Sequence, residues 1–145
     1  MTLTRRAWLL VALPLLTACG GSSRPSVDAG AQARANATQR LEGRWLLVDF
    51  QPEVRAEPML AALLSAQLNH MVITFQSPSV RAAGVGVDTT RQYKVVDALG
   101  ERVAVRTTDE TGVAYDAVGV FRGTDLLFES RTIPWRGRGV LRRLP

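Results

Sequence analysis

Few residues of this 145-residue chain are of the types that carry out chemistry, and their spacing forms no catalytic or metal-binding motif. Cys19 is the one cysteine, which excludes an intrachain disulfide and a site built from several thiolates. His70 is the one histidine, and it lies between a predicted helix and a predicted strand, where a capping or surface role fits better than catalysis. The sequence contains no serine-centred elbow, no paired metal ligands and no phosphate-binding loop. We therefore expect no enzyme activity, no metal and no cofactor.

The carboxylates give no support for acid–base catalysis either. Several of them sit at predicted turns, where a carboxylate favours the local backbone geometry. A pair of the kind that glycosidases use is not indicated. The short segment Gly84-Val85-Gly86 predicts a bend within a strand. The acidic residues predicted at turns are Asp88, Asp97, Asp109, Glu110 and Asp125.

The surroundings of Cys19 do indicate chemistry. Arg5 and Arg6 precede an apolar run at residues 7–16, and Thr17-Ala18 forms a step of small residues before the cysteine. This is the layout of a secretory signal peptide. The run is about half of the roughly 20 residues that span a bilayer as a helix. Residues 1–18 are therefore predicted to be a signal peptide rather than a permanent membrane span.

The segment Leu16-Thr17-Ala18-Cys19 resembles the lipobox of bacterial lipoproteins. The resemblance implies that the Cys19 thiol receives a diacylglyceryl group and that a dedicated peptidase cuts between Ala18 and Cys19. Two or more acyl chains give stable anchoring to a membrane, so the mature protein is expected at the cell envelope. Gly20-Gly21 favour the outer membrane, if the organism has one. An ordinary secreted protein with an incidental cysteine is the alternative, and residues 4–10 also resemble a twin-arginine export signal.

The mature chain divides into a tether and a domain. Residues 19–40 begin with the lipidated cysteine and carry almost no apolar residues that could be buried, so they are predicted to form a flexible tether. Residues 41–145 are long enough for one domain with a modest core.

Five arginines crowd the last fifteen residues of the chain. Arg136-Gly137-Arg138-Gly139 is similar to the RG box of RNA-binding tails. Because an exported protein rarely meets RNA, we expect no nucleic-acid partner. A basic edge that faces anionic lipid head groups and an ordinary solvated face are the remaining interpretations. The arginines are Arg131, Arg136, Arg138, Arg142 and Arg143.

Hydrophobic periodicity predicts a mainly β domain. Apolar residues at helical spacing predict one helix over residues 58–68, and from residue 71 the period changes to two. About eight strands joined by short turns predict a single antiparallel meander that closes into a small barrel, with the helix between strands one and two. An antiparallel sheet wrapped around the helix is the alternative. The predicted strands are residues 43–50, 71–75, 80–87, 91–96, 102–107, 113–122, 126–132 and 139–144.

The start of the first strand, Gly43-Arg44-Trp45, resembles the Gly-x-Trp motif of lipocalins and related eight-stranded barrels. In those families an arginine near the end of the last strand packs over the tryptophan, and Arg142 and Arg143 are placed for that role. The resemblance implies a lipocalin-like barrel with Trp45 buried at its closed end. The helix between strands one and two differs from the usual lipocalin, whose main helix follows the barrel.

Two functions fit such a barrel. One is the binding of an apolar small molecule without catalysis, and the other is an envelope interaction or inhibitor protein with a filled barrel core. In a barrel this small, side chains can fill the interior completely, and the sequence favours that outcome over a cavity. A cavity of a few hundred Å³ would favour the binding function. The aromatic residues that could line a pocket are Trp45, Tyr93, Tyr115, Phe121 and Phe128.

Overall fold

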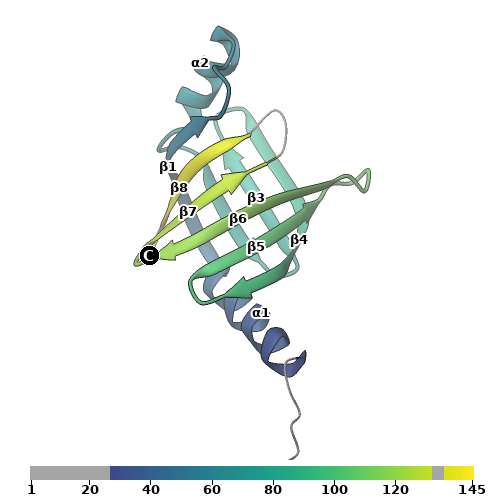
Figure 1. The fold of residues 1–145 in the computed structure, drawn as a ribbon. Coiled ribbons are helices and arrows are strands. Elements are labelled where there is room, and N and C mark those ends of the chain that lie inside the picture. Colours follow the sequence, from purple (N-terminus) through teal and green to yellow (C-terminus); the bar gives the residue numbers. More distant parts are fainter. Residues whose placement is uncertain (1–26, 132–135) are drawn as a thin grey trace, which may run out of the picture.

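The computed structural model describes residues 27–131 and 136–145, which form a closed antiparallel barrel with a helix at each of its two ends (Figure 1). The eight strands follow one another in chain order, and β1 pairs with β8 to close the sheet. The helices are α1 (Val27–Leu41) and α2 (Pro58–Gln67). The strands are β1 (Gly43–Pro52), β2 (Val72–Gln76), β3 (Ser79–Gly84), β4 (Val87–Leu99), β5 (Arg102–Thr108), β6 (Ala114–Arg122), β7 (Asp125–Ser130) and β8 (Gly137–Arg143).

The barrel predicted from the sequence is confirmed, including the helix between strands one and two. The alternative of a sheet wrapped around that helix is wrong, because α2 lies at one end of the closed sheet (Figure 1). Two local predictions also need correction. The segment Gly84-Val85-Gly86 is not a bend within one strand: Gly84 ends β3, and Val85-Gly86 forms the turn to β4, in which Gly86 takes a positive φ of 66°. The fourth strand runs on through Asp97 to Leu99, with a register shift between Val95 and Asp97.

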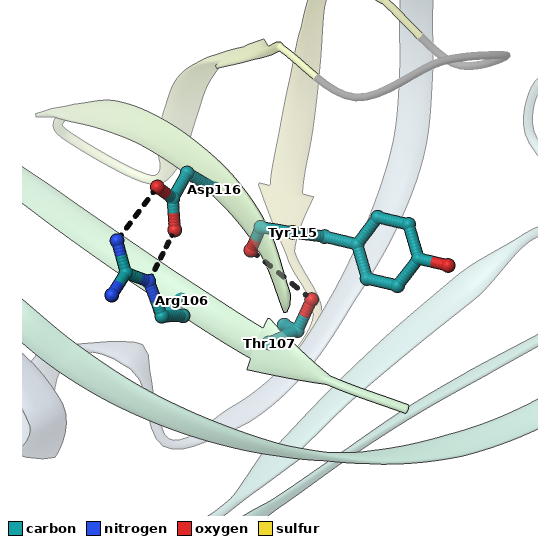
Figure 2. A network of polar contacts seen from close by, with 4 residues as sticks. All are labelled: Arg106, Thr107, Tyr115 and Asp116. Carbon is teal, nitrogen blue, oxygen red and sulfur yellow. Dashed lines mark hydrogen bonds and ion pairs between the residues drawn. The ribbon is translucent and has the colours of Figure 1, made fainter. Parts of the chain in front are cut away.

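The outer face of the sheet carries ion pairs that link neighbouring strands. Arg106 on β5 stands directly opposite Asp116 on β6, and the two form a two-pronged pair at 2.7 and 2.9 Å. Figure 2 shows that Tyr115, the neighbour of Asp116, points away from this pair, as successive residues of a strand must. Asp88, predicted at a turn, lies instead within β4 and pairs with Arg81 on β3. These charged side chains therefore occupy outward positions, and the inward positions on the same strands face the core.

Residues 27–40 correct the prediction of a flexible tether, because they belong to helix α1. The helix packs one face against the end of the barrel, where Leu41 is fully buried and Ala37 is 7% exposed. Ala33 and Gly30 continue this face at helical spacing and are partly buried. The stretch is rich in polar residues, yet alanine has the best helix propensity and needs no large apolar side chain to pack closely. Small residues at positions 30, 33 and 37 were the signal for this helix.

Trp45 closes the barrel end that α1 covers. Its side chain is 1% exposed, and its indole nitrogen donates a hydrogen bond of 2.8 Å to the carbonyl oxygen of Leu41. The Arg143 guanidinium lies 4.3 Å from the centre of the indole ring and donates hydrogen bonds to the carbonyls of Arg40 and Glu42. These carbonyls end α1, where a helix leaves acceptors unpaired. The burial of Trp45 beneath a terminal-strand arginine, expected from the lipocalin resemblance, is thus present.

Candidate functional site

A cavity of about 390 Å³ lies inside the barrel. Its floor is formed by the buried leucines Leu41, Leu47, Leu126 and Leu141, which stand above the closed end just described. The prediction of a completely filled interior was therefore wrong. The remaining lining residues are Phe50, Leu64, Gln67, Met71, Ile73, Phe75, Val80, Ala82, Val87, Thr89, Arg91, Val103, Val105, Thr107, Ala117, Val118, Gly119, Phe128 and Ser130.

Small residues at inward positions account for the space. Ala82 on β3, Ala117 and Gly119 on β6 and Ser130 on β7 all line the cavity. A large side chain at each of these positions would fill the interior, as happens in many small barrels. Gly119 is also required for packing, because a Cβ there would lie 2.8 Å from Leu126. The volume left over is within the range of small-molecule pockets, roughly 300–1,000 Å³.

Four polar residues line the end of the cavity opposite α1, beside apolar residues such as Leu64 and Val87. Thr89 and Arg91 lie in the first half of β4, while Thr107 and Ser130 lie near the last residues of β5 and β7. Because these strands alternate in direction, all four positions belong to the same end of the barrel. Thr89 lines the cavity and is nevertheless exposed, so this end is open to solvent. Among the described lining residues, Arg91 is the sole charged one.

A chain of contacts fixes Arg91. Its guanidinium lies 4.5 Å from the centre of the Tyr115 ring, a distance at which a cation is attracted to the face of an aromatic ring. The Tyr115 hydroxyl in turn donates a 2.9 Å hydrogen bond to Asp109. The other Asp109 oxygen accepts hydrogen bonds from the hydroxyl and backbone nitrogen of Thr111 and from the backbone nitrogen of Val113.

These hydrogen bonds set the ionisation of the loop. The Thr111 hydroxyl, followed by the Val113 amide, the Tyr115 hydroxyl and the Thr111 amide, lowers the pKa of Asp109 to about 2. The hydrogen bond to Asp109 raises the pKa of Tyr115. Near neutral pH the loop after β5 therefore holds a carboxylate anion and a neutral phenol, and the phenol ring supports Arg91.

Helix α2 is fastened to the β3–β4 turn by a buried glutamine. The Gln67 side chain is 1% exposed, donates to the carbonyl of Val85 at 2.8 Å and accepts from the amide of Val85 at 3.0 Å. A Cβ on Gly84 would lie 2.2 Å from the Gln67 oxygen, so a glycine is needed there. Leu64, one turn earlier on α2, is buried and lines the cavity. The helix thus forms part of the wall at the open end.

The structure separates the five aromatic residues proposed to line a pocket. Phe128 lines the cavity, as predicted. Trp45 and Phe121 belong to the closed end, with ring centres 6.4 Å apart. Tyr93 packs edge-on against Phe75 and donates its hydroxyl to Glu42 at 3.2 Å, and Tyr115 supports Arg91. Tyr93 and Tyr115 are not themselves lining residues.

Arg91 was missed, although the sequence held a signal for it. In β4 the residues Val87, Arg91, Tyr93 and Val95 share one face, and Tyr93 is buried. An arginine in phase with buried residues of a strand is unusual, because a charge facing a core is costly unless it has a partner. That phase was the available evidence for a functional position.

The arginines near the C-terminus are partly paired with acids. Four of them share three carboxylates, and Arg143 covers Trp45. The interpretation as a basic edge for anionic lipid stays a prediction. The pairs are Arg131 and Arg138 with Glu129, Arg136 with Glu53, and Arg142 with Asp125.

Residues 27–131 and 136–145 meet neither the requirements of a three-ligand metal site nor those of a membrane-spanning helix. Within these ranges no group of three or more histidines, cysteines or carboxylates is placed to hold a metal ion. Neither α1 nor α2 has the length and apolar character that a membrane-spanning helix needs. Ala18 and Cys19, the predicted cleavage and lipid-attachment residues, lie outside the described part of the chain. No family model, no curated protein and no solved structure matches this sequence.

Proposed function

We propose that this protein is a lipid-anchored lipoprotein of the cell envelope whose barrel binds an apolar small molecule and catalyses no reaction. The observation that carries the binding function is the 390 Å³ cavity with its largely aliphatic and aromatic lining. Burial of apolar surface contributes about 25 cal/mol for each Å² removed from water, so such a cavity favours an apolar guest.

The anchor rests on the sequence around Cys19. Its lipobox-like context supports lipidation at that residue, with cleavage after Ala18. Helix α1 begins at Val27 and packs against the closed end of the barrel. The open end of the cavity lies at the opposite end of the barrel from α1, the helix that follows the anchor in the chain. A ligand would enter from the side away from the anchoring lipid.

The alternative function, an envelope interaction or inhibitor protein, was tied to a filled barrel core. The cavity removes that premise. One observation still favours a contact surface, since Val54, Met59, Val85 and Val113 are at least half exposed and belong to α2 and to the loops of the open end. An apolar rim of this kind also suits the entry of an apolar ligand. We therefore retain ligand binding as the main proposal.

A matched pair of alanine variants tests the cavity. Ala82 lines the cavity. Its neighbour Ala83, the register partner of Asp88 on β4, lies on the other face of β3. N-phenyl-1-naphthylamine, a neutral apolar fluorophore whose emission rises in apolar surroundings, serves as the probe for the full chain. We expect saturable binding, weakened about tenfold or more by Ala82→Phe and unchanged by Ala83→Phe, because tenfold corresponds to the loss of about 1.4 kcal/mol.

Fluorophore that binds outside the cavity, for example to lipid or detergent in the sample, would bind equally in both variants. A difference between the two variants therefore reports binding in the cavity. Absence of saturable binding to the unaltered chain, or equal affinities of the two phenylalanine variants, would refute the binding function.

A further inference from the structure

Arg91 has no acidic partner among the described residues, and it differs from the other unpaired strand arginines, Arg44, Arg102, Arg122 and Arg143, because it lines the cavity. The ion pairs of this part of the chain involve Arg40, Arg81, Arg106, Arg131, Arg136, Arg138 and Arg142. Those side chains are exposed on the outside, where pairing contributes little energy. Arg91 instead lines the cavity and is partly buried. The one charged residue among the described lining residues therefore has no counter-charge within 4.0 Å.

Asp109, which binds Tyr115, does not neutralise Arg91. One Asp109 oxygen accepts a hydrogen bond from the Tyr115 hydroxyl, and the other accepts hydrogen bonds from the loop. No ion pair within 4.0 Å joins Asp109 to Arg91. Tyr115 offers Arg91 a ring face, which leaves the donor groups of the guanidinium available. The contact with Tyr115 thus positions the Arg91 guanidinium without neutralising its charge.

An apolar ligand that fills the cavity would displace water from Arg91. A buried charge without a partner is strongly unfavourable, so a fully neutral ligand would be opposed at this end. An anionic group would replace the lost water, and a guanidinium binds the two oxygens of a carboxylate through parallel hydrogen bonds. Thr89 and Ser130 line the same end, and their hydroxyls can donate further hydrogen bonds, whereas the Thr107 hydroxyl already donates to the Tyr115 carbonyl.

We infer that the ligand is an amphiphile with an apolar body and an anionic head group, and that Arg91 binds the head group at the open end of the cavity. The inference rests on the proposed binding function and specifies its ligand class. The apolar body would lie toward the leucine floor. The head group would meet Arg91 and the hydroxyls beside it.

Displacement of the neutral fluorophore by two ligands of equal chain length tests the inference. Dodecanoate carries a carboxylate and 1-dodecanol does not. We expect dodecanoate to bind the unaltered chain about 10- to 100-fold more tightly than dodecanol, since a hydrogen bond to a charged group contributes about 1.5–3 kcal/mol. Arg91→Gln should remove this preference, and Arg91→Lys should keep part of it, because lysine retains the charge but not the planar fork.

Lys94→Gln is the matched control. It removes one positive charge from the outer face of the same strand, so it reports any general effect of charge on the binding of an anion. We expect it to leave the preference for dodecanoate intact. Fluorophore affinity and thermal melts of each variant show whether the cavity has stayed folded.

The outcomes separate the two proposals. If the fluorophore does not bind the unaltered chain, the binding function itself fails. If the fluorophore binds but dodecanol equals dodecanoate, the inference about Arg91 is wrong while the binding function stands. Retention of the preference by Arg91→Gln would also overturn the inference. Should Arg91→Gln fail to fold, the comparison of the two ligands on the unaltered chain and on Arg91→Lys still decides the matter.

Discussion

Replacement of Trp45 by alanine tests the packing of the closed end. A buried tryptophan removes about 150–250 Å² from water, which at about 25 cal/mol per Å² amounts to roughly 4–6 kcal/mol before the part that alanine retains is subtracted. The carbonyl of Leu41 would also lose its indole donor, at a cost of about 1 kcal/mol. Because large-to-small changes at buried aromatic positions typically cost about 3–5 kcal/mol, we expect Trp45→Ala to lower the free energy of unfolding by about 4 kcal/mol.

Urea melts followed by circular dichroism measure this loss. Two further variants divide it into its parts. Trp45→Phe keeps most of the ring and loses the hydrogen bond, so we expect it to cost about 1–2 kcal/mol. Leu99→Ala removes a side chain that is 78% exposed and should change the stability by less than about 0.5 kcal/mol.

A small effect would refute this account of the closed end. If Trp45→Ala costs less than about 1 kcal/mol with an unchanged dependence on urea, Trp45 does not hold α1 and the barrel together. A loss equal to that of Leu99→Ala would lead to the same conclusion. Complete unfolding of Trp45→Ala is compatible with the expectation, since a small domain has about 5–15 kcal/mol in total, and Trp45→Phe then gives the measurable value.

Two further predictions concern Tyr93 and Cys19. Burial, and then the nearby Glu42 carboxylate, raise the pKa of Tyr93 from 10.0 to about 12, so the folded protein holds the phenol proton more tightly than the unfolded chain does. Its contribution is fully present below pH 10 and is lost as the pH rises from about 10 to about 12, by up to roughly 2–3 kcal/mol; Tyr93→Phe should abolish this part of the loss in alkaline melts, and an ultraviolet titration of both tyrosines complete near pH 10 would contradict it. Cys19→Ser should move the protein from the detergent phase to the aqueous phase in phase partitioning, and equal aqueous partitioning of both forms would contradict lipidation.

The fold was predictable because the apolar pattern of the strands is regular. Alternation such as that of Met71, Ile73 and Phe75 indicates a strand with one buried face, and short turns between such strands leave an antiparallel meander as the simple arrangement. The turn at Val85-Gly86 was harder to predict, since apolar residues run through it without a polar break. Helix α1 was missed for a different reason, which is that Ala37 and its small neighbours pack closely against the barrel although most residues around them are polar.

The cavity could not be predicted from the aromatic residues. Whether a barrel is filled depends on the sum of all inward side-chain volumes at one level, and that sum requires the register of every strand pair. Ala82, Ala117 and Gly119 look ordinary in three separate stretches of sequence, and the closed sheet brings them around one space. The aromatic residues were proposed because they are large, yet four of the five serve the packing or support the loop at the open end.

The two ends of the barrel differ in how they treat polar groups, and this difference separates stability from binding. At the closed end Trp45 and Arg143 supply donors to the last carbonyls of α1, so removal of a residue there should destabilise the fold. At the open end Arg91 is positioned by Tyr115 but lacks a counter-charge among the described residues, so its removal withdraws no ion pair from that part of the fold. Variants of Trp45 should therefore lower the melting temperature without changing the preference among ligands, and variants of Arg91 should do the reverse. Both the melting temperature and the preference for dodecanoate should be measured for both sets of variants. If one substitution changes both properties, stability and ligand preference do not depend on separate ends of the barrel.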